Sequence, residues 1–126
     1  MKKAIVSGST GFIGSILVKH LTERGIEVVA LGRQNFDDIS NRVRKNINQA
    51  SYLKIRMEDI EDLQDALIKI NWNAGDECVF FNLAWGGEEK LSDLNISAQI
   101  ENVSQSVSAL EISKKIGCSK FLQVGT

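Results

Sequence analysis

Three glycines stand three residues apart in the run Gly8-Ser-Thr-Gly-Phe-Ile-Gly14. Such glycines give a tight turn between a strand and a helix, let a pyrophosphate approach the bare backbone, and let the helix pack closely on its strand. The free N–H groups and the positive end of the helix dipole then face the anion. The alternative is a turn whose glycines serve the backbone alone. If a ligand binds, we expect its contacts to come from Gly8, Thr10, Gly11, Phe12, Ile13 and Gly14.

The sequence around the glycines favours the ligand-binding interpretation. An apolar segment at residues 3–7 precedes them, an amphipathic segment at residues 12–24 follows, and a second apolar segment at residues 26–31 begins after Gly25. Strand, glycine turn, helix and strand is the order found in dinucleotide-binding units. The run therefore predicts a phosphate-binding turn at the start of an α/β chain.

The composition limits the remaining classes of function. The 126 residues fit one domain, and 43% apolar and 25% charged residues are typical of a soluble globular protein. The 15 basic and 16 acidic residues are interspersed and give a net charge of −1. No strong field is available to recruit nucleic acid or an anionic membrane. We expect no nucleic-acid partner and no membrane association.

The two cysteines, Cys78 and Cys118, lie far apart in the sequence and have no neighbouring cysteine or histidine. This spacing indicates neither a metal site nor a disulfide framework, and it predicts buried thiols of a cytoplasmic protein. No segment is long and apolar enough for a membrane span or a signal peptide.

Five segments of strand length alternate with segments of helical period. The helical segments are expected at residues 12–24, 35–50, 63–70 and 92–116, with apolar faces that include Ile13 in the first and Ile96, Ile100, Val103, Val107 and Leu110 in the last. The strands are expected at residues 3–7, 27–31, 52–56, 78–83 and 120–124.

This alternation predicts βαβ units with right-handed crossovers. The simplest arrangement is an α/β, Rossmann-like doubly wound parallel sheet of five strands in the order 3-2-1-4-5, with helices on both faces. Strand three is expected at the edge and strand four in the interior. A ligand would bind at the carboxyl ends of strands one and four, where the winding reverses.

Five ordered landmarks make the chain resemble the N-terminal part of the extended short-chain dehydrogenase/reductases, the nucleotide-sugar epimerase and dehydratase family. They are Thr10-Gly-Phe-Ile-Gly14, Asp59-Ile60, Asn82-Leu-Ala84, Asn102-Val103 and Lys120-Phe-Leu-Gln-Val-Gly-Thr126. The resemblance implies that residues 1–126 are an NAD(P)-binding Rossmann domain, that the substrate-binding part is absent, and that the chain is truncated.

The resemblance also assigns roles to single residues. It implies hydride transfer at a carbon of a nucleotide-sugar substrate, with Thr126 as the catalytic hydroxyl; the alternative is that Thr126 is only where the sequence stops. Asp59 would contact the adenine, or cap a helix, or do both. Asn102 would lie near the nicotinamide ribose. The remaining cofactor contacts would come from Ile60, Leu83, Ala84 and Trp85, where Trp85 either borders the nicotinamide or covers the sheet.

The other catalytic groups of the family, a tyrosine and a lysine four residues later, are not found. Tyr52 is the only tyrosine, it falls in the third expected strand, and residue 56 is an arginine. A phenol needs a nearby cation to work as an acid or base near neutral pH. We therefore expect a catalytically incomplete chain, either truncated or a free-standing, non-catalytic NAD(P)-binding sensor or regulatory module.

If the chain is truncated, the fifth expected strand loses the structure that would cover it. Apolar surface and backbone groups of that strand would then be exposed, which predicts self-association as a homo-oligomer, or marginal stability.

The end of the second expected strand bears on the choice of cofactor. NAD-binding units place an acidic residue there for the ribose 2′-hydroxyl, but this chain reads Leu31-Gly-Arg-Gln34. The Arg33 guanidinium would hold a 2′-phosphate with two hydrogen bonds, so NADP is preferred over NAD. The alternatives are that Arg33 is a solvated loop residue, or that Asp37 or Asp38 supplies the acid.

Overall fold

The computed structural model describes residues 1–85 and 96–124. Its five parallel strands form one sheet in the order β3-β2-β1-β4-β5, which is the predicted order. The strands are β1 (Lys3–Ser7), β2 (Glu27–Gly32), β3 (Ser51–Lys54), β4 (Cys78–Asn82) and β5 (Lys120–Gln123). The Rossmann-like α/β fold expected from the sequence is confirmed, with β3 at an edge and β4 in the interior.

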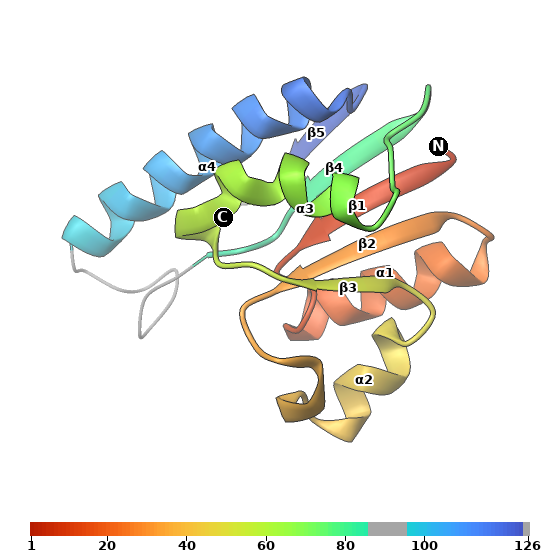
Figure 1. The fold of residues 1–126 in the computed structure, drawn as a ribbon. Coiled ribbons are helices and arrows are strands. Elements are labelled where there is room, and N and C mark those ends of the chain that lie inside the picture. Colours follow the sequence, from red (N-terminus) through yellow and green to blue (C-terminus); the bar gives the residue numbers. More distant parts are fainter. Residues whose placement is uncertain (86–95, 125–126) are drawn as a thin grey trace.

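Four α-helices and two short 3₁₀ helices connect the strands in the described residues. Figure 1 shows α1 and α2 on one side of the sheet and α3 and α4 on the other. The predicted surface helix at residues 35–50 is divided between η1 and α2, and the acidic turn before α3 forms η2. The elements are α1 (Phe12–Glu23), η1 (Phe36–Asp38), α2 (Asn41–Ile47), η2 (Met57–Asp62), α3 (Leu63–Lys69) and α4 (Ile96–Ile116).

The central strand β1 divides the core into two layers because its side chains alternate between the faces of the sheet. Ile5 packs in the layer that includes Leu63 of α3 and Ile112 of α4. Val6 packs in the other layer with Val18 of α1. The side chains on both faces of β1 are therefore buried, as expected for a parallel strand that helices cover on either side.

The prediction of a buried apolar face on the first helix is partly wrong. Ile13 is 65% exposed, whereas α1 buries Gly14, Ser15, Val18 and the expected Leu21. The first turn of α1 has no room for a side chain at residue 14, because a Cβ there would lie 2.0 Å from Gly8 O.

The prediction that the apolar face of the last helix packs on the core is also wrong. The residues of that face are exposed, while α4 buries Asn102, Ala109, Ile112 and Ser113. Only Ile112 of the four buried residues is large and apolar, so most of the large apolar residues of α4 lie outside the core. The exposed set is Ile96, Ile100, Val103, Val107 and Leu110.

The described part of the chain offers no candidate for a membrane span or a metal site. None of its helices is both long enough and apolar enough to cross a membrane. Within residues 1–85 and 96–124, no cluster of three or more histidine, cysteine, aspartate or glutamate side chains is arranged to hold a metal ion.

Candidate functional site

The glycine turn joins β1 to α1 beside the end of β4. Gly8 has φ +66°, and a Cβ there would lie 2.9 Å from Ala84 N. A Cβ on Gly14 would lie 2.0 Å from Gly8 O. Positive φ and two close backbone approaches make Gly8 and Gly14 requirements of the fold itself.

Gly11 is different. It is the N-cap of α1 with φ −76° and ψ 172°, a conformation that any residue can adopt, and it supplies no side-chain cap. A Cβ there would meet only Gly8 O, at 3.4 Å. Residues such as serine are preferred over most others at this position because they bond to the first helical N–H groups. The fold therefore does not require a glycine at residue 11, and a ligand that occupies the uncapped helix end would account for its presence.

A polar network, in which Ser7 and Asn82 are buried and Gln123 is exposed, lies beneath the turn where β1, β4 and β5 end. The Ser7 hydroxyl donates to Asn82 Oδ1 and accepts from Leu83 N at 3.1 Å. Asn82 Nδ2 donates to Gln123 Oε1 at 2.7 Å. The network fixes the carboxyl ends of three adjacent strands, and the roles of Ser7 and Gln123 were not predicted from the sequence.

A second polar contact fixes the turn to β2. The Ser9 hydroxyl donates to Leu31 O at 2.8 Å, and Ser9 N donates to the same carbonyl at 3.2 Å. Ser9 is fully buried. These bonds hold the glycine turn against the strand that leads to Arg33, and only the position of Ser9 within the run could have indicated them.

The loop after β2 is supported by Tyr52. Tyr52 Oη donates to Gln34 O at 2.6 Å. A Cβ on Gly32 would lie 2.4 Å from the same Tyr52 Oη atom. Burial raises the pKa of the Tyr52 phenol above its ordinary value. Arg33 beside it is exposed, and no acidic side chain of residues 1–85 or 96–124 forms an ion pair with it.

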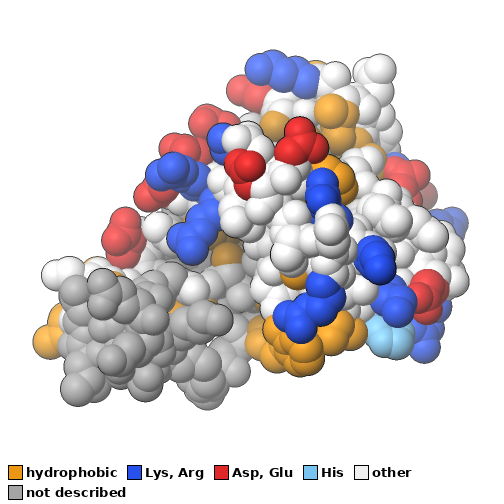
Figure 2. Space-filling view, turned by 90° about the horizontal axis from the view of Figure 1, so that it is seen from below, with side chains coloured by type: hydrophobic (Ala, Val, Ile, Leu, Met, Phe, Trp, Pro, Cys, Tyr) orange, Lys and Arg blue, Asp and Glu red, His pale blue; other side chains and the backbone are white. Residues whose placement is uncertain are grey.

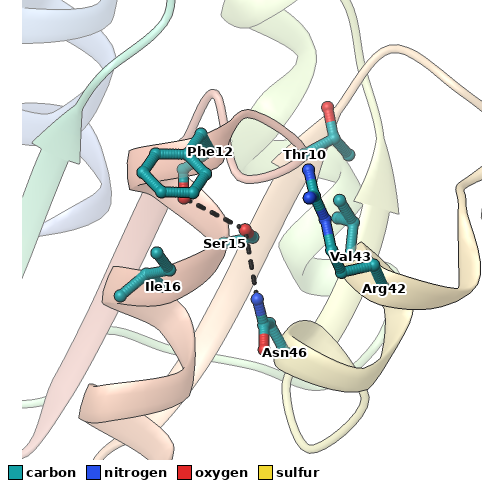
Figure 3. A pocket seen from close by; sticks show the side chains of 7 residues that line it. All are labelled: Thr10, Phe12, Ser15, Ile16, Arg42, Val43 and Asn46. Carbon is teal, nitrogen blue, oxygen red and sulfur yellow. Dashed lines mark hydrogen bonds between the residues drawn. The ribbon is translucent and has the colours of Figure 1, made fainter.

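A cavity of about 220 Å³ lies between α1 and α2 next to the turn. Figure 3 shows Arg42 extending from α2 toward Thr10, and the Asn46 amide donating to Ser15 Oγ at 3.4 Å. In Figure 2, which views the molecule from below, a cluster of exposed hydrophobic side chains lies at the lower edge of the picture, with Lys and Arg side chains directly beside it. Arg42 was not predicted, and nothing in its local sequence distinguishes it from other surface arginines.

Asp59 and Ile60 lie in η2, after the carboxyl end of β3. Asp59 is exposed and lies at a kink within η2, where its φ of −109° and ψ of 17° are not helical, but in the described residues its side chain accepts no hydrogen bond from a backbone N–H. The capping alternative for Asp59 is therefore not found. Ile60 is 1% exposed, and its side chain packs in the core layer that contains Ile5.

The other expected contacts lie around the carboxyl end of β4. Leu83, Ala84 and Trp85 follow that strand and are partly buried, and Ala84 N contacts Ser7 Oγ at 3.4 Å. Asn102 is buried on α4. Thr126, the expected catalytic hydroxyl, lies outside the described residues.

The doubly wound parallel sheet with a glycine turn at its switch point is a Rossmann-like α/β fold. The model of the NAD dependent epimerase/dehydratase family matches residues 4–126. The chain belongs to this family. No curated protein sequence gives a significant match.

Several solved structures are similar to this chain. The UDP-glucose 4-epimerase of Thermotoga maritima, solved with UDP-glucose, has 24% identity and a TM-score of 0.68, covering 98% of this chain and 38% of that protein. The UDP-glucose 4-epimerase of Thermus thermophilus, solved with NAD, has 22% identity and a TM-score of 0.71, covering 94% and 36%. WbmG of Bordetella bronchiseptica, solved with NAD and UDP, has 17% identity and a TM-score of 0.67, covering 95% and 36%. This chain thus spans a little over a third of the length of each of these proteins.

Proposed function

We propose that residues 1–126 are the NAD(P)-binding domain of an enzyme that acts on a nucleotide sugar. The observation that carries this proposal is Gly11, a glycine that the fold does not need, at an uncapped helix end. An approaching pyrophosphate explains both the missing Cβ and the missing cap. Family membership and the similarity to structures that hold NAD support the same assignment.

The bound nicotinamide would supply hydride transfer at a sugar carbon. The residues of this chain would hold and orient it. The turn from Gly8 to Gly14 would bind the pyrophosphate, and Asp59 would accept a hydrogen bond from the adenine amino group. Ala84 and Asn102 would border the nicotinamide half, and the hydroxyl of Thr126 would bond to the substrate oxygen that is oxidised or reduced.

We further propose that NADP is preferred over NAD. Arg33 stands at the end of β2, is exposed, and has no ion-pair partner among the residues described. Arg42 extends from α2 toward Thr10 of the glycine turn (Figure 3). Two guanidinium groups near the adenosine ribose favour a 2′-phosphate, which accepts paired hydrogen bonds from arginine.

The substitution Gly11→Ser separates ligand binding from folding. Serine is a good N-cap, and its Cβ has room, so the unfolding midpoint should stay the same or rise slightly. Its side chain would occupy the place of the pyrophosphate, so the affinity for NADPH and NADH should fall at least about tenfold, or about 1.4 kcal/mol.

The matched control is Gly14→Ser, whose Cβ would lie 2.0 Å from Gly8 O. This variant should lose stability because a backbone contact must shift. An unchanged affinity of a stable Gly11→Ser variant would exclude the proposed position of the pyrophosphate.

The second candidate is a non-catalytic NAD(P)-binding sensor or regulatory module. The position of Tyr52 is the observation that favours it. This sole tyrosine is bonded to Gln34 O, and burial raises the pKa of its phenol, the opposite of what an acid/base catalyst near neutral pH needs. The enzyme therefore needs a tyrosine and a lysine from outside residues 1–126. A coding sequence in which Tyr-x-x-x-Lys follows shortly after residue 126 supports the enzyme, and a stop codon there supports the module.

We also propose that the chain associates with itself through α4. Ile96, Ile100, Val103, Val107 and Leu110 are exposed and follow one another at alternating steps of four and three residues. This spacing forms a single stripe along a helix, which is the pattern of helix-to-helix packing. We call these five residues the α4 stripe.

A further inference from the structure

The two cysteines, which are 40 positions apart in the sequence, are neighbours in the structure. Cys78 is the first residue of β4, and Cys118 lies in the turn between α4 and β5. Their sulfur atoms are 3.5 Å apart. The turn is fixed beside β4, because Ser119 N donates to Cys78 O at 2.8 Å and Cys118 N donates to Ser113 O at 2.9 Å.

The pair is separate from the candidate cofactor site. Strand β4 runs from Cys78 to Asn82, and the glycine turn contacts the residues that follow Asn82. The cysteines therefore lie at the amino end of the strand, opposite the end at which a dinucleotide binds. Neither thiol has a part in the proposed function.

The surroundings of the two thiols differ. Cys78 is fully buried in the core, whereas Cys118 is partly exposed. In the neutral pair the Cys118 thiol donates to the Cys78 sulfur. Once Cys118 has ionised it can only accept, and the bond that Cys78 then donates lowers the pKa of Cys118, whereas this bond together with burial raises the pKa of Cys78. Cys118 is therefore the accessible nucleophile, and Cys78 is held beside it.

We propose that Cys78 and Cys118 are an oxidative modification site, at which a small-molecule disulfide converts the two thiols into a reversible intramolecular disulfide. The sulfur atoms must approach by about 1.5 Å to reach the S–S bond length of about 2.05 Å. Because adjacent backbone bonds already hold the two residues together, we expect side-chain rotation to supply most of this movement.

The reaction takes place in two exchange steps. The Cys118 thiolate attacks one sulfur of the small disulfide RSSR, forms a mixed disulfide and releases one thiolate RS⁻. The Cys78 thiol then passes its proton to the first RS⁻ as its sulfur attacks the Cys118 sulfur and releases the second RS⁻, which takes up a proton from solvent. In total, two protein thiols are oxidised to one disulfide, and RSSR is reduced to two thiols.

The disulfide would close a loop over residues 78–118, which includes Ala84 and Asn102 of the candidate site. Closing a loop of this length restricts the unfolded chain more than the folded one. The oxidised protein should therefore unfold about 10 °C higher than the reduced protein. Oxidation would in this way stabilise the part of the chain that borders the nicotinamide half.

The test is to incubate the folded chain with mixtures of oxidised and reduced glutathione. We expect both free thiols to be lost together, the mass to fall by two hydrogen atoms, the chain to gain no intermolecular link, and a peptide joining residues 78 and 118 to appear. The same titration in concentrated urea gives the reference for the unfolded chain. The equilibrium constant for disulfide formation should be at least about tenfold larger in the folded protein.

Two results would overturn the proposal. One is a folded protein whose thiols stay reduced under conditions that oxidise the unfolded chain, and the other is an equal or smaller equilibrium constant in the folded state. Single substitutions test the order of attack. Cys78→Ala leaves Cys118, which should take up one glutathionyl group, whereas Cys118→Ser leaves the buried Cys78, which should react at least about tenfold more slowly in the folded protein. Equal reactivity of the two variants would contradict the assignment of Cys118 as nucleophile, and the readout on Cys118→Ser stands if Cys78→Ala does not fold.

Discussion

The Ser7 hydroxyl donates a hydrogen bond to the buried side chain of Asn82, so the carboxyl ends of β1 and β4 are joined directly beneath the glycine turn. The same hydroxyl accepts hydrogen bonds from Leu83 N at 3.1 Å and Ala84 N at 3.4 Å. One serine thus positions the segment against which Gly8 packs. The shape of the candidate site depends on this contact.

Asn82→Ala should be strongly destabilising. It leaves the buried Ser7 hydroxyl without its acceptor and removes the donor to Gln123 Oε1. The unpaired buried Ser7 hydroxyl and the space left by the side chain predict a loss of about 2–3 kcal/mol in the free energy of unfolding, measured by urea denaturation, whereas the exposed Gln123 amide can bond to water instead. Ser106→Ala is the matched control, because its bond to Asn82 Nδ2 is long at 3.5 Å, and it should cost less than about 1 kcal/mol. Similar losses in the two variants would contradict the role given to Asn82.

Arg33→Ala should change the choice between cofactors. The affinity for NADPH should fall at least about tenfold, because a charge-assisted pair with the 2′-phosphate is lost, while the affinity for NADH should stay the same. Arg24→Ala, at the far end of α1, removes another exposed arginine and should affect neither cofactor. Calorimetric titration of each variant with both cofactors measures the difference. Equal losses for NADPH and NADH in Arg33→Ala would count against the 2′-phosphate contact.

Tyr52→Phe should alter stability in a pH-dependent way. At neutral pH the variant loses the hydrogen bond to Gln34 O, at a cost of about 1 kcal/mol. Burial raises the pKa of the phenol in the folded state, so the stabilisation by Tyr52 is complete below about pH 10 and is lost as the pH rises further. The wild-type protein should therefore lose stability more steeply than the variant as the pH rises above about 10. Parallel stability curves from urea denaturation would show that the phenol pKa is the same in both states.

Lysine in the α4 stripe should weaken self-association. Ile100→Lys and Val107→Lys place a charge where an apolar contact is proposed, so sedimentation velocity should show a shift toward the monomer. Glu101→Lys alters an exposed residue on another side of α4 and should leave the distribution unchanged. A wild-type chain that is monomeric at all concentrations would refute the stripe as an interface.

The strands and their order could be predicted because each strand is a short apolar run and the crossovers have one hand. The glycine turn could be predicted because its spacing is local. The buried side of α4 could not, because its burial of Asn102 and Ala109 rather than Ile100 depends on tertiary packing and not on hydrophobicity alone.

Contacts between distant segments were also missed. The pairing of Ser7 with Asn82 depends on strand register across 75 positions. The approach of Cys78 to Cys118 depends on where α4 ends and β5 begins. Such contacts exist only after the sheet has been assembled, and the residue types alone do not specify them.

The most direct test of the central claim is calorimetric titration of the folded chain with NADPH and with NADH. Binding at a single site, with NADPH tighter than NADH, is the result that the glycine turn and Arg33 predict. Binding of neither dinucleotide by a sample with a cooperative unfolding transition would contradict the assignment of this domain as an NAD(P)-binding unit.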